Sequence, residues 1–111
     1  MLNKKQAFEG SLIEFAEFAR VMSHPARIAI LKTLAEKQMC ICGDIVEVLP
    51  LAQSTVSQHL KELKNMGLIR GEIEGVKSCY CLDWERLDYF FNLFHAQFTQ
   101  LKEFQSHCKT C

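Results

Sequence analysis

The sequence has no excess of charge of either sign, because 13 lysine and arginine residues balance 13 aspartate and glutamate residues. Zero net charge means weak long-range attraction to a polyanion, so contact with nucleic acid would depend on a few well-placed cations. The sequence also lacks an apolar run close to the roughly 18 residues that a membrane-spanning helix needs. Its first residues do not have the pattern of a signal peptide. We therefore expect a cytoplasmic protein with no membrane partner.

The chain has 111 residues, of which 49% are hydrophobic, and this is enough for one domain with its own core. A domain of this size buries a modest share of its surface, which favours a homodimer that shares apolar surface. The six cysteines, in a reducing compartment, favour metal or redox ligands over structural disulfides.

The segment from Gln53 to Ile69 has the pattern of a helix followed by a strand. Val56, Leu60 and Leu63 recur at steps of four and three, so they share one face of the helix. Gly67 can take the left-handed conformation that ends a helix. A helix with one apolar face and short polar side chains on the other suits the major groove of DNA. The polar residues at its start are Ser54, Thr55, Ser57 and Gln58.

The neighbouring segments predict a helix-turn-helix and a hairpin around this helix. A short helix from residue 44 is ended by Pro50, so residues 44–66 form the helix-turn-helix. Two segments rich in strand-forming residues flank a loop with glycine, which predicts a hairpin over 68–82. Upstream, apolar spacing predicts a helix over 5–22. Ser23 can cap the next helix, which has Pro25 in its first turn, and the expected core stripe of that helix is Ile28, Leu31, Leu34 and Ala35.

The last predicted helix, over 84–106, has a heptad seam of large apolar side chains. So much apolar surface on a terminal helix needs a cover, which the first helix of the same chain or of a second subunit could supply. A homodimer is the favoured interpretation, and a helix packed only on its own domain is the alternative. The seam consists of Leu87, Phe91, Phe94, Phe98 and Leu101.

Cys40 and Cys42 are two residues apart, which restricts what they can bind. On a helix their side chains would point to nearly opposite sides, whereas on an extended segment they share one face. A disulfide between residues two apart would be strained, so a pair of metal ligands is favoured. Thiolates prefer soft ions such as trivalent arsenic or antimony, Cd(II), Pb(II), Cu(I) or Zn(II). The alternative is two ordinary buried residues.

Three stretches together indicate a known family: residues 24–31, which read HPARIAIL, residues 54–69, and the Cys40–Cys42 pair. They resemble the second helix, the recognition helix and the paired-cysteine sensor of ArsR/SmtB winged-helix repressors of the arsenite or cadmium/lead branch. The resemblance implies one mainly α domain over 1–111 with a small β-hairpin wing, which dimerises through its first and last helices. It also implies that the ligand-free form binds a double-stranded DNA operator with two-fold symmetry and leaves it when the ligand binds.

The resemblance predicts which residues contact DNA. Gln58 would read adenine, and lysines would hold phosphates. His59 would face the groove or would be a half-buried hydrogen-bonding residue. The alternative for the whole helix is that its serines only cap it and its lysines are only solvated. The predicted DNA-contacting residues are Gln53, Ser54, Thr55, Ser57, Gln58, His59, Lys61, Lys64 and Lys77.

By the same resemblance, the regulatory ion at Cys40 and Cys42 is arsenite or antimonite first, and then cadmium, lead or zinc. The sequence departs from the pattern at two places. Gly43 separates the second cysteine from the acidic Asp44, and no cysteine precedes Cys40. A further sulfur ligand must therefore come from elsewhere in the chain.

Two other cysteine pairs could supply that ligand. Cys79 and Cys81 lie two apart on the second wing strand, so they share a face. They would approach Cys40 or Cys42 if a short strand before the recognition helix paired with this wing strand, and the alternative is that they only pack. Cys108 and Cys111, at the end of the sequence, could instead reach across the dimer.

Other functions of the cysteines stay open. A repressor of the same fold could respond to oxidants or polysulfide through a disulfide. A metal-buffering protein without DNA binding is more remote. A thiol-disulfide enzyme using Cys108 and Cys111 would need a thioredoxin-like βαβ context, which the sequence lacks. We therefore do not expect an enzyme.

Overall fold

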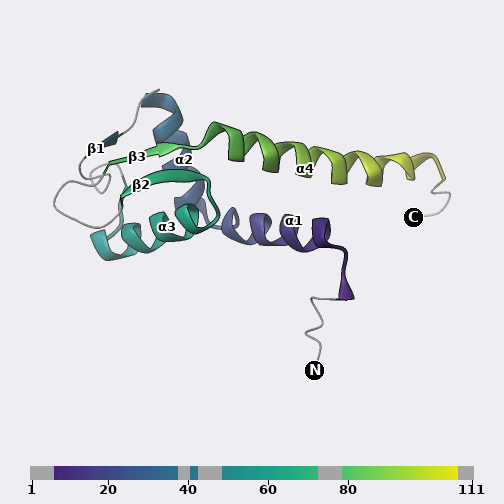
Figure 1. The fold of residues 1–111 in the computed structure, drawn as a ribbon, viewed down its shortest axis with the longest axis horizontal. Helices are drawn as coiled ribbons and strands as arrows, with labels where there is room; N and C mark the ends of the chain where they lie inside the picture. The colour runs from purple at the N-terminus through teal and green to yellow at the C-terminus, as the bar shows by residue number, and fades with distance from the viewer. Residues whose placement is uncertain (1–6, 38–40, 43–48, 73–78, 108–111) are drawn as a thin grey trace.

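The computed structural model describes residues 7–37, 41–42, 49–72 and 79–107 (Figure 1). Within these residues, helices predominate and three short strands form one small sheet, which confirms the expected mainly α fold with a hairpin wing. No helix of the described ranges is long and apolar enough to cross a bilayer. The elements in chain order are α1 (Gly10–Val21), α2 (Pro25–Lys37), β1 (Ile41–Cys42), α3 (Gln53–Asn65), β2 (Ile69–Glu72), β3 (Cys79–Leu82), α4 (Trp84–Glu103) and a 3-10 turn, η3 (Gln105–His107).

The terminal helices are shorter than the spacing predicted. Glu9 is extended, with φ −56° and ψ 142°, and its carbonyl accepts hydrogen bonds from the amides of Leu12 and Ile13 at 3.0 and 3.2 Å. It is therefore the N-cap of α1, which begins at Gly10 rather than at residue 5. Helix α4 ends at Glu103 rather than at 106, because the chain tightens into the 3-10 turn η3. Residues 43–48, where a short helix was expected, lie outside the described residues.

Helix α2 starts as expected, but with a different cap. The Ser23 hydroxyl donates to the Arg20 carbonyl at 2.6 Å and so belongs to the end of α1. The cap is His24, whose Nδ1 accepts a hydrogen bond from the Ala26 amide at 3.0 Å. The buried stripe also differs, because Ile30 is fully buried and Ile28 is 42% exposed. The spacing placed Ile28 in the core stripe and not Ile30, so this prediction was wrong for Ile28, because packing against the sheet and α3 turns Ile30 inward.

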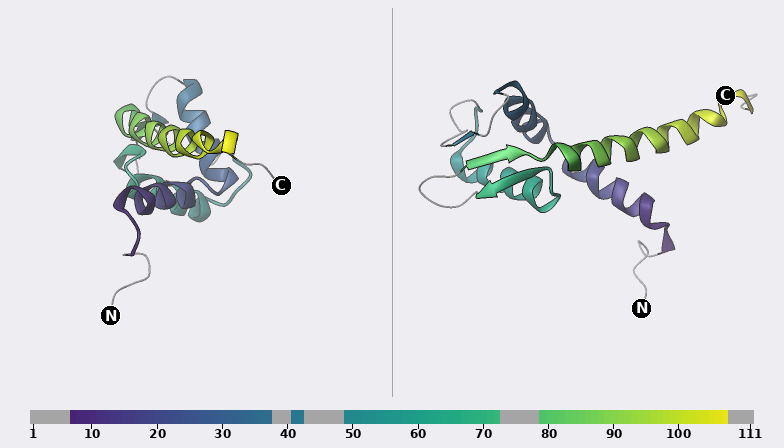
Figure 2. Two further views of the ribbon diagram at one scale, coloured as in Figure 1. Left: turned by 90° about the vertical axis from the view of Figure 1, so that its right-hand side faces the viewer. Right: turned by 45° about the horizontal axis from the view of Figure 1, so that its top comes forward.

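The sheet has the order β1–β3–β2, with both pairs antiparallel (Figure 2). In the wing, Ile69 lies opposite Leu82 and Glu72 lies opposite Cys79. On the other side of β3, Ile41 lies opposite Tyr80 and Cys42 opposite Cys79. The short strand before the recognition helix therefore does pair with the second wing strand, as one of the sequence hypotheses required.

Two glycines allow this geometry. Gly67 has φ +83°, and the Leu68 amide bonds the Leu63 carbonyl at 3.0 Å, so α3 ends in a Schellman-type cap, as predicted. Gly71 has φ +128°, and a Cβ there would lie 1.9 Å from the Cys79 carbonyl oxygen. A side chain would force the two wing strands apart, so only glycine fits at this position.

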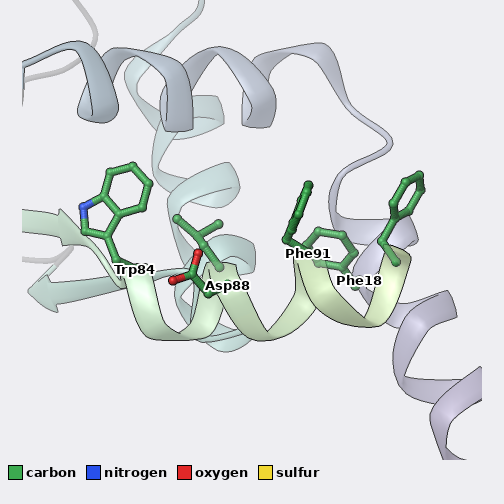
Figure 3. A pocket seen from close by; sticks show the side chains of 6 residues that line it. Phe18, Trp84, Asp88 and Phe91 are labelled. Atoms are coloured by element: carbon green, nitrogen blue, oxygen red, sulfur yellow. The ribbon is translucent and has the colours of Figure 1, made fainter. Parts of the chain in front are cut away.

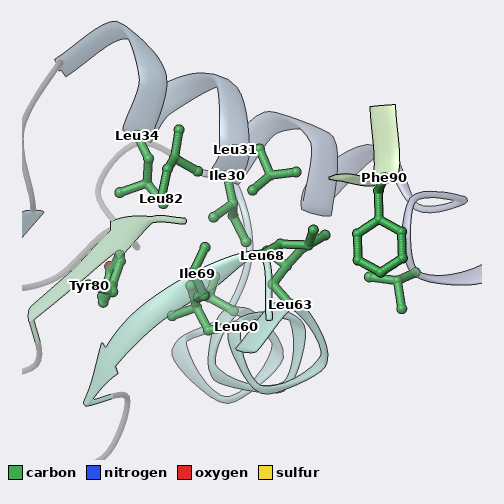
Figure 4. Packing of buried hydrophobic residues seen from close by; sticks show 12 residues of the cluster. Ile30, Leu31, Leu34, Leu60, Leu63, Leu68, Ile69, Tyr80, Leu82 and Phe90 are labelled. Carbon is green, nitrogen blue, oxygen red and sulfur yellow. The ribbon is translucent and has the colours of Figure 1, made fainter. Parts of the chain in front are cut away.

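The core joins the sheet to residues of four helices (Figure 4). Leu60 and Leu63 of α3 and Ile30 and Leu34 of α2 point toward Ile69 and the other buried residues of the sheet (Figure 4). Each fully buried side chain of this size contributes about 1.5–3 kcal/mol, so α3 is held firmly on the domain by its apolar face. The sheet residues of this core are Ile69, Tyr80 and Leu82; Leu68 lies directly before β2, α1 adds Val21 and α4 adds Phe90.

Helix α4 begins at the core and extends away from it, with α1 against its first half (Figure 1). The rings of Phe18 and Phe90 stack at 4.8 Å, and those of Phe15 and Phe94 lie 5.8 Å apart. Phe90, which lies beside the seam on α4, is fully buried. The rest of α4 has no cover within the described part of the chain.

Candidate nucleic-acid interface and thiol cluster

Helix α3 separates its side chains into a buried face and an exposed polar row. Val56, Leu60 and Leu63 are at most 5% exposed, as their spacing predicted. Ser57 is half-buried. The polar residues on the opposite side are solvent-exposed and lie along one helix, so they form a continuous row that a DNA groove can accept. This row consists of Gln53, Ser54, Thr55, Gln58, Lys61 and Lys64.

The start of α3 presents backbone donors beside this row. Ala52 is the N-cap and has no polar side chain to cap the helix. The first helical hydrogen bond is made by the Val56 amide to the Ala52 carbonyl, at 3.0 Å. The amides of residues 53–55 therefore have no acceptor inside the helix, and such amides, at the positive end of the helix dipole, suit a phosphate oxygen.

An acidic residue on α3 is paired with a cation from another helix. A carboxylate oxygen of Glu62 lies 3.4 Å from the Arg20 guanidinium of α1. Glu62 directly follows Lys61 and lies one helical turn after Gln58, so its charge would otherwise oppose a phosphate. The pair is exposed and adds little stability, but it offsets one negative charge next to the row.

His59 differs from the predicted groove-facing set, because it is only 7% exposed. Its Nδ1 accepts a hydrogen bond from Arg27 Nε at 3.2 Å, and its ring centroid lies 4.3 Å from that of His24. Arg27 also donates to the Val21 carbonyl at 3.1 Å. His59 therefore fastens α3 to the start of α2 and does not belong to the exposed row.

The environment of His59 disfavours its protonated form. Burial lowers the pKa of His59 below its ordinary value, and electrostatic interactions with His24 and Arg27 lower it further, while Glu62 opposes the shift. Arg27 and His24 were not predicted as functional residues. The HPAR motif was a signal for them, because it sets a histidine and an arginine three residues apart at a helix start.

On the wing, the structure describes the two strands but not the tip. Lys77 lies in residues 73–78, outside the described residues. Arg70 on β2 is exposed, and its Nε lies 3.7 Å from an Asp83 carboxylate oxygen. An exposed pair of this kind contributes at most about 1 kcal/mol.

The cysteines of the wing lie on the outer face of the sheet. Along β3, Tyr80 and Leu82 are buried while Cys79 and Cys81 are half-buried, so both cysteines face away from the core. Both are disulfide-bonded in the structure. Cys42 is described by its backbone, in register with Cys79.

The other candidate ligands are not placed. Cys40, Cys108 and Cys111 lie outside the described residues. Within the ranges that are described, no group of three or more histidine, cysteine or acidic side chains could hold a metal ion. The structure thus places Cys79 and Cys81 on β3 and the backbone of Cys42 opposite Cys79. The complete set of metal ligands stays a prediction.

Comparison with known proteins agrees with this arrangement. Residues 24–70, which span α2 to the start of the wing, match the family model of the bacterial regulatory protein, arsR family. An arsenical resistance operon repressor from Staphylococcus xylosus is 36% identical over 76 residues, which are 68% of this chain and 72% of the relative.

A second relative and a solved structure extend the comparison. The HTH-type transcriptional repressor SmtB from Mycobacterium tuberculosis is 42% identical over 66 residues, which are 60% of this chain. The chain matches about half of that relative's length, 48%. An ArsR-like transcriptional regulator from Rhodococcus sp. RHA1 has the same fold, with a TM-score of 0.69, 18% identity, and coverage of 89% of this chain and 92% of the other.

The lowered pKa of His59 predicts a loss of stability in mild acid. The unfolded chain takes up a proton near pH 6.5, the ordinary value, whereas the folded protein does so only at lower pH. The contribution of neutral His59 to the free energy of unfolding is therefore complete above pH 6.5. It decreases as the pH falls from there to the lower pKa of the folded protein. Urea denaturation at a series of pH values on both sides of this point measures the change.

The matched control is His59→Gln, which cannot ionise in this range and keeps an oxygen that can accept from Arg27. We expect this variant to lose a clear part of the pH dependence seen in the parent protein. Equal pH dependence in the two proteins would show that His59 is not the titrating group.

Proposed function

Since the chain belongs to the arsR family of bacterial regulatory proteins, we propose that it is a transcriptional repressor that leaves its DNA operator when a soft metal or metalloid ion binds. In this proposal it acts as a homodimer on double-stranded DNA with two-fold symmetry. The observation that supports it most directly is the exposed polar row of α3, opposite the buried face that fixes the helix on the core.

The proposed DNA contacts divide into two kinds. Gln58, in the middle of the exposed row, reads a base edge, because an amide can bond N6 and N7 of adenine together. Lys61, Lys64 and the free amides at the start of α3 hold phosphates, as does Lys77 on the wing. Phosphate contacts position the protein, whereas base contacts give it sequence preference. His59 is left out of this set because it is buried.

Local placement of charge compensates for the zero net charge. The row presents Lys61 and Lys64, while the nearest acid on α3, Glu62, is paired with Arg20. The positive ends of the helix amides add to this local field. The surface that meets the phosphates is therefore positive although the whole chain is not.

The exposed half of α4 supports a dimer. Four of its five seam residues stay exposed in the single chain, from 44% for Phe94 to 70% for Leu101, while Leu87 is half-buried against the core. Beside them lies a hollow of about 420 Å³ between α1 and α4, lined by five apolar residues and Asp88 (Figure 3). A second copy would bring an equivalent seam and could fill the hollow, because a two-fold interface pairs the same patch on both subunits. A patch of this kind on one chain usually marks an interaction surface.

The proposed effector is a thiophilic ion, with arsenite or antimonite first and cadmium, lead or zinc next. Cys40 and Cys42 are its proposed first ligands. Two cysteines two residues apart face one ion only on an extended segment, and β1 is extended at Ile41 and Cys42. The relative that is an arsenical resistance operon repressor supports arsenite. Such an ion would cross-link the cysteines, because the extended segment holds their sulfurs on one of its faces.

A second candidate effector is an oxidant or a polysulfide. The disulfide bonding of Cys79 and Cys81 favours it, because these sulfurs are already close to other sulfurs. In metal-free buffer, DNA release that a reductant reverses would support this candidate over the ion.

For DNA binding, we expect Lys64→Ala to weaken operator and unrelated DNA alike and to reduce the slope of log K against log salt by about one. Gln58→Ala should instead cost about 1–3 kcal/mol at one base pair and relax the preference there. Fluorescence anisotropy at several salt concentrations separates the two effects. Lys102→Ala, in the last turn of α4, is the matched control and should bind like the parent. Equal effects of Lys64→Ala and Lys102→Ala would argue against the interface.

For the dimer, we expect Phe98→Glu to produce a monomer, because it puts a charge in the exposed part of the seam where the partner would bury it. Sedimentation velocity measures the mass, and binding to a two-fold operator should weaken with it. Asn92→Glu adds the same charge on the opposite side of α4 and should stay dimeric. If the Phe98→Glu variant dimerises as strongly as the parent protein, the interface lies elsewhere.

For release, we expect Cys40→Ser plus Cys42→Ser to bind the operator as tightly as the parent without any ion. In the parent, arsenite or cadmium should weaken binding roughly 5- to 150-fold, the range of an allosteric coupling of about 1–3 kcal/mol. The double variant should lose this response, as read by anisotropy titration with each ion. Release that persists in the double variant would contradict the assignment of these cysteines.

A further inference from the structure

We propose that Cys79 and Cys81 on β3 are ligands of the same soft ion as Cys42, so that the sensor site is closed within one subunit across the β1–β3 pair. The inference rests on the proposed function, in which a thiophilic ion binds at the paired cysteines. It adds the source of the remaining sulfurs and makes the wing itself part of the sensor.

The strand register supports this site. Cys42 lies directly opposite Cys79 in an antiparallel pair. Residues opposite each other in such a pair lie on the same face of the sheet, with Cα atoms about 4.5–5.5 Å apart. Cys81 is two residues further along β3 and therefore faces the same side. Three cysteines from two strands are thus placed on one face.

The disulfide bonding of β3 points to cysteines outside that strand. Cα atoms two residues apart on one strand are separated by about 6.4–6.8 Å, near the upper limit that a disulfide spans. Residues opposite each other on paired strands are well within that limit. The sulfurs bonded to Cys79 and Cys81 are therefore best supplied from a neighbouring segment, and the register makes Cys42 the nearest candidate for Cys79.

When the disulfides are reduced, thiols that lie this close to one another can bind one ion together. Sulfurs that can approach to bonding distance can also lie on opposite sides of one ion, where each metal–sulfur bond is about 2.3 Å long for zinc. Cys79 and Cys81 are half-buried rather than enclosed, so an ion can reach them from solvent. Their neighbours Tyr80 and Leu82 are anchored in the core, which fixes the positions of the two sulfurs.

The test is a titration of the reduced, metal-free, full-length protein with Cd(II), followed by the ultraviolet charge-transfer absorbance of cadmium–thiolate bonds. Cys79→Ser plus Cys81→Ser should lower the absorbance per ion by about half or more, since it removes two of three or four thiolates. The affinity for Cd(II) should fall by more than the roughly 10–100-fold that loss of a supporting residue around a metal site costs.

Cys108→Ser plus Cys111→Ser is the matched control, because it removes the same number of thiols from the end of the sequence. It should leave the absorbance and the affinity unchanged. The inference is overturned if this pair lowers the absorbance and the β3 pair does not. Circular dichroism of both variants checks that the fold is kept, and a folded β3 variant with parental absorbance is equally contrary to the proposal.

Mixed dimers test whether the site lies within one subunit. A dimer of one Cys42→Ser chain and one chain with both β3 cysteines replaced has no complete site if the ligands come from one subunit. It has one complete site if they come from two. We expect no parent-like cadmium absorbance in the mixed dimer, and recovery of half the parental signal would overturn closure within a subunit.

The outcomes also separate this inference from the proposed function. If Cys40→Ser plus Cys42→Ser abolishes ion-induced DNA release while the β3 variant releases like the parent, the repressor proposal stands and the inference fails. If the ion binds at the β3 cysteines but never alters DNA affinity, the inference stands and the proposed regulation fails.

Discussion

The hydrogen-bonded position of β3 between β1 and β2 is the constraint on which the functional parts of this molecule depend. Its inner face places Tyr80 and Leu82 in the core, and its outer face presents Cys79 and Cys81. At its end, the Asp83 carboxylate accepts from the Arg86 amide at 3.0 Å and so begins α4. This strand of four residues therefore pairs with β1, forms the wing together with β2, and leads into the start of α4, the proposed dimer helix.

The recognition helix is tied to the same strand through a short route. The Asp83 amide donates to the Leu68 carbonyl at 2.9 Å, and Leu68 directly follows the Schellman-type cap that ends α3. Leu68 is fully buried, so this connection cannot shift without repacking the core. On the other side of α3, His59 and Arg27 hold the helix to α2. The exposed row of α3 is therefore presented at a fixed angle to the rest of the domain.

The sequence was sufficient for the parts of the fold that depend on a long repeating pattern. Val56, Leu60 and Leu63 were assigned to the buried face from spacing alone, and the cap at Gly67 followed from its chemistry. Spacing chose Ile28 over Ile30 and was wrong, because either phase gives α2 an apolar face and only tertiary packing decides between them. His59 was ambiguous for a similar reason, since an imidazole can bond a base or a buried arginine, and only the nearby Arg27 decides between them.

Strand β1 and the cysteine cluster show a different limit of sequence reasoning. A strand of two residues has no periodicity to detect, and its pairing with β3 depends on a contact between segments nearly 40 residues apart along the chain, from Cys42 to Cys79. The pairing of β1 with β3 was a hypothesis drawn from winged-helix folds in general. Which residues of the two strands lie opposite each other is known only from the structure. Spacing along the sequence narrowed the choice of cysteine ligands for the ion. Which cysteines face each other depends on how the strands pair in the folded chain.

The size of the proposed regulatory effect is compatible with such a compact connection. A 5- to 150-fold change in DNA affinity needs about 1–3 kcal/mol, which is no more than the free energy of burying one large side chain. An ion that links β1 to β3 does not have to unfold or rotate a domain to supply it. It has only to favour one arrangement of β3, because β3 is packed against the core on one side and leads directly into α4 on the other. In the proposed dimer, a two-fold operator amplifies a small change, because both recognition helices must fit the grooves at once and the proposed dimer helices, which follow β3, set their spacing.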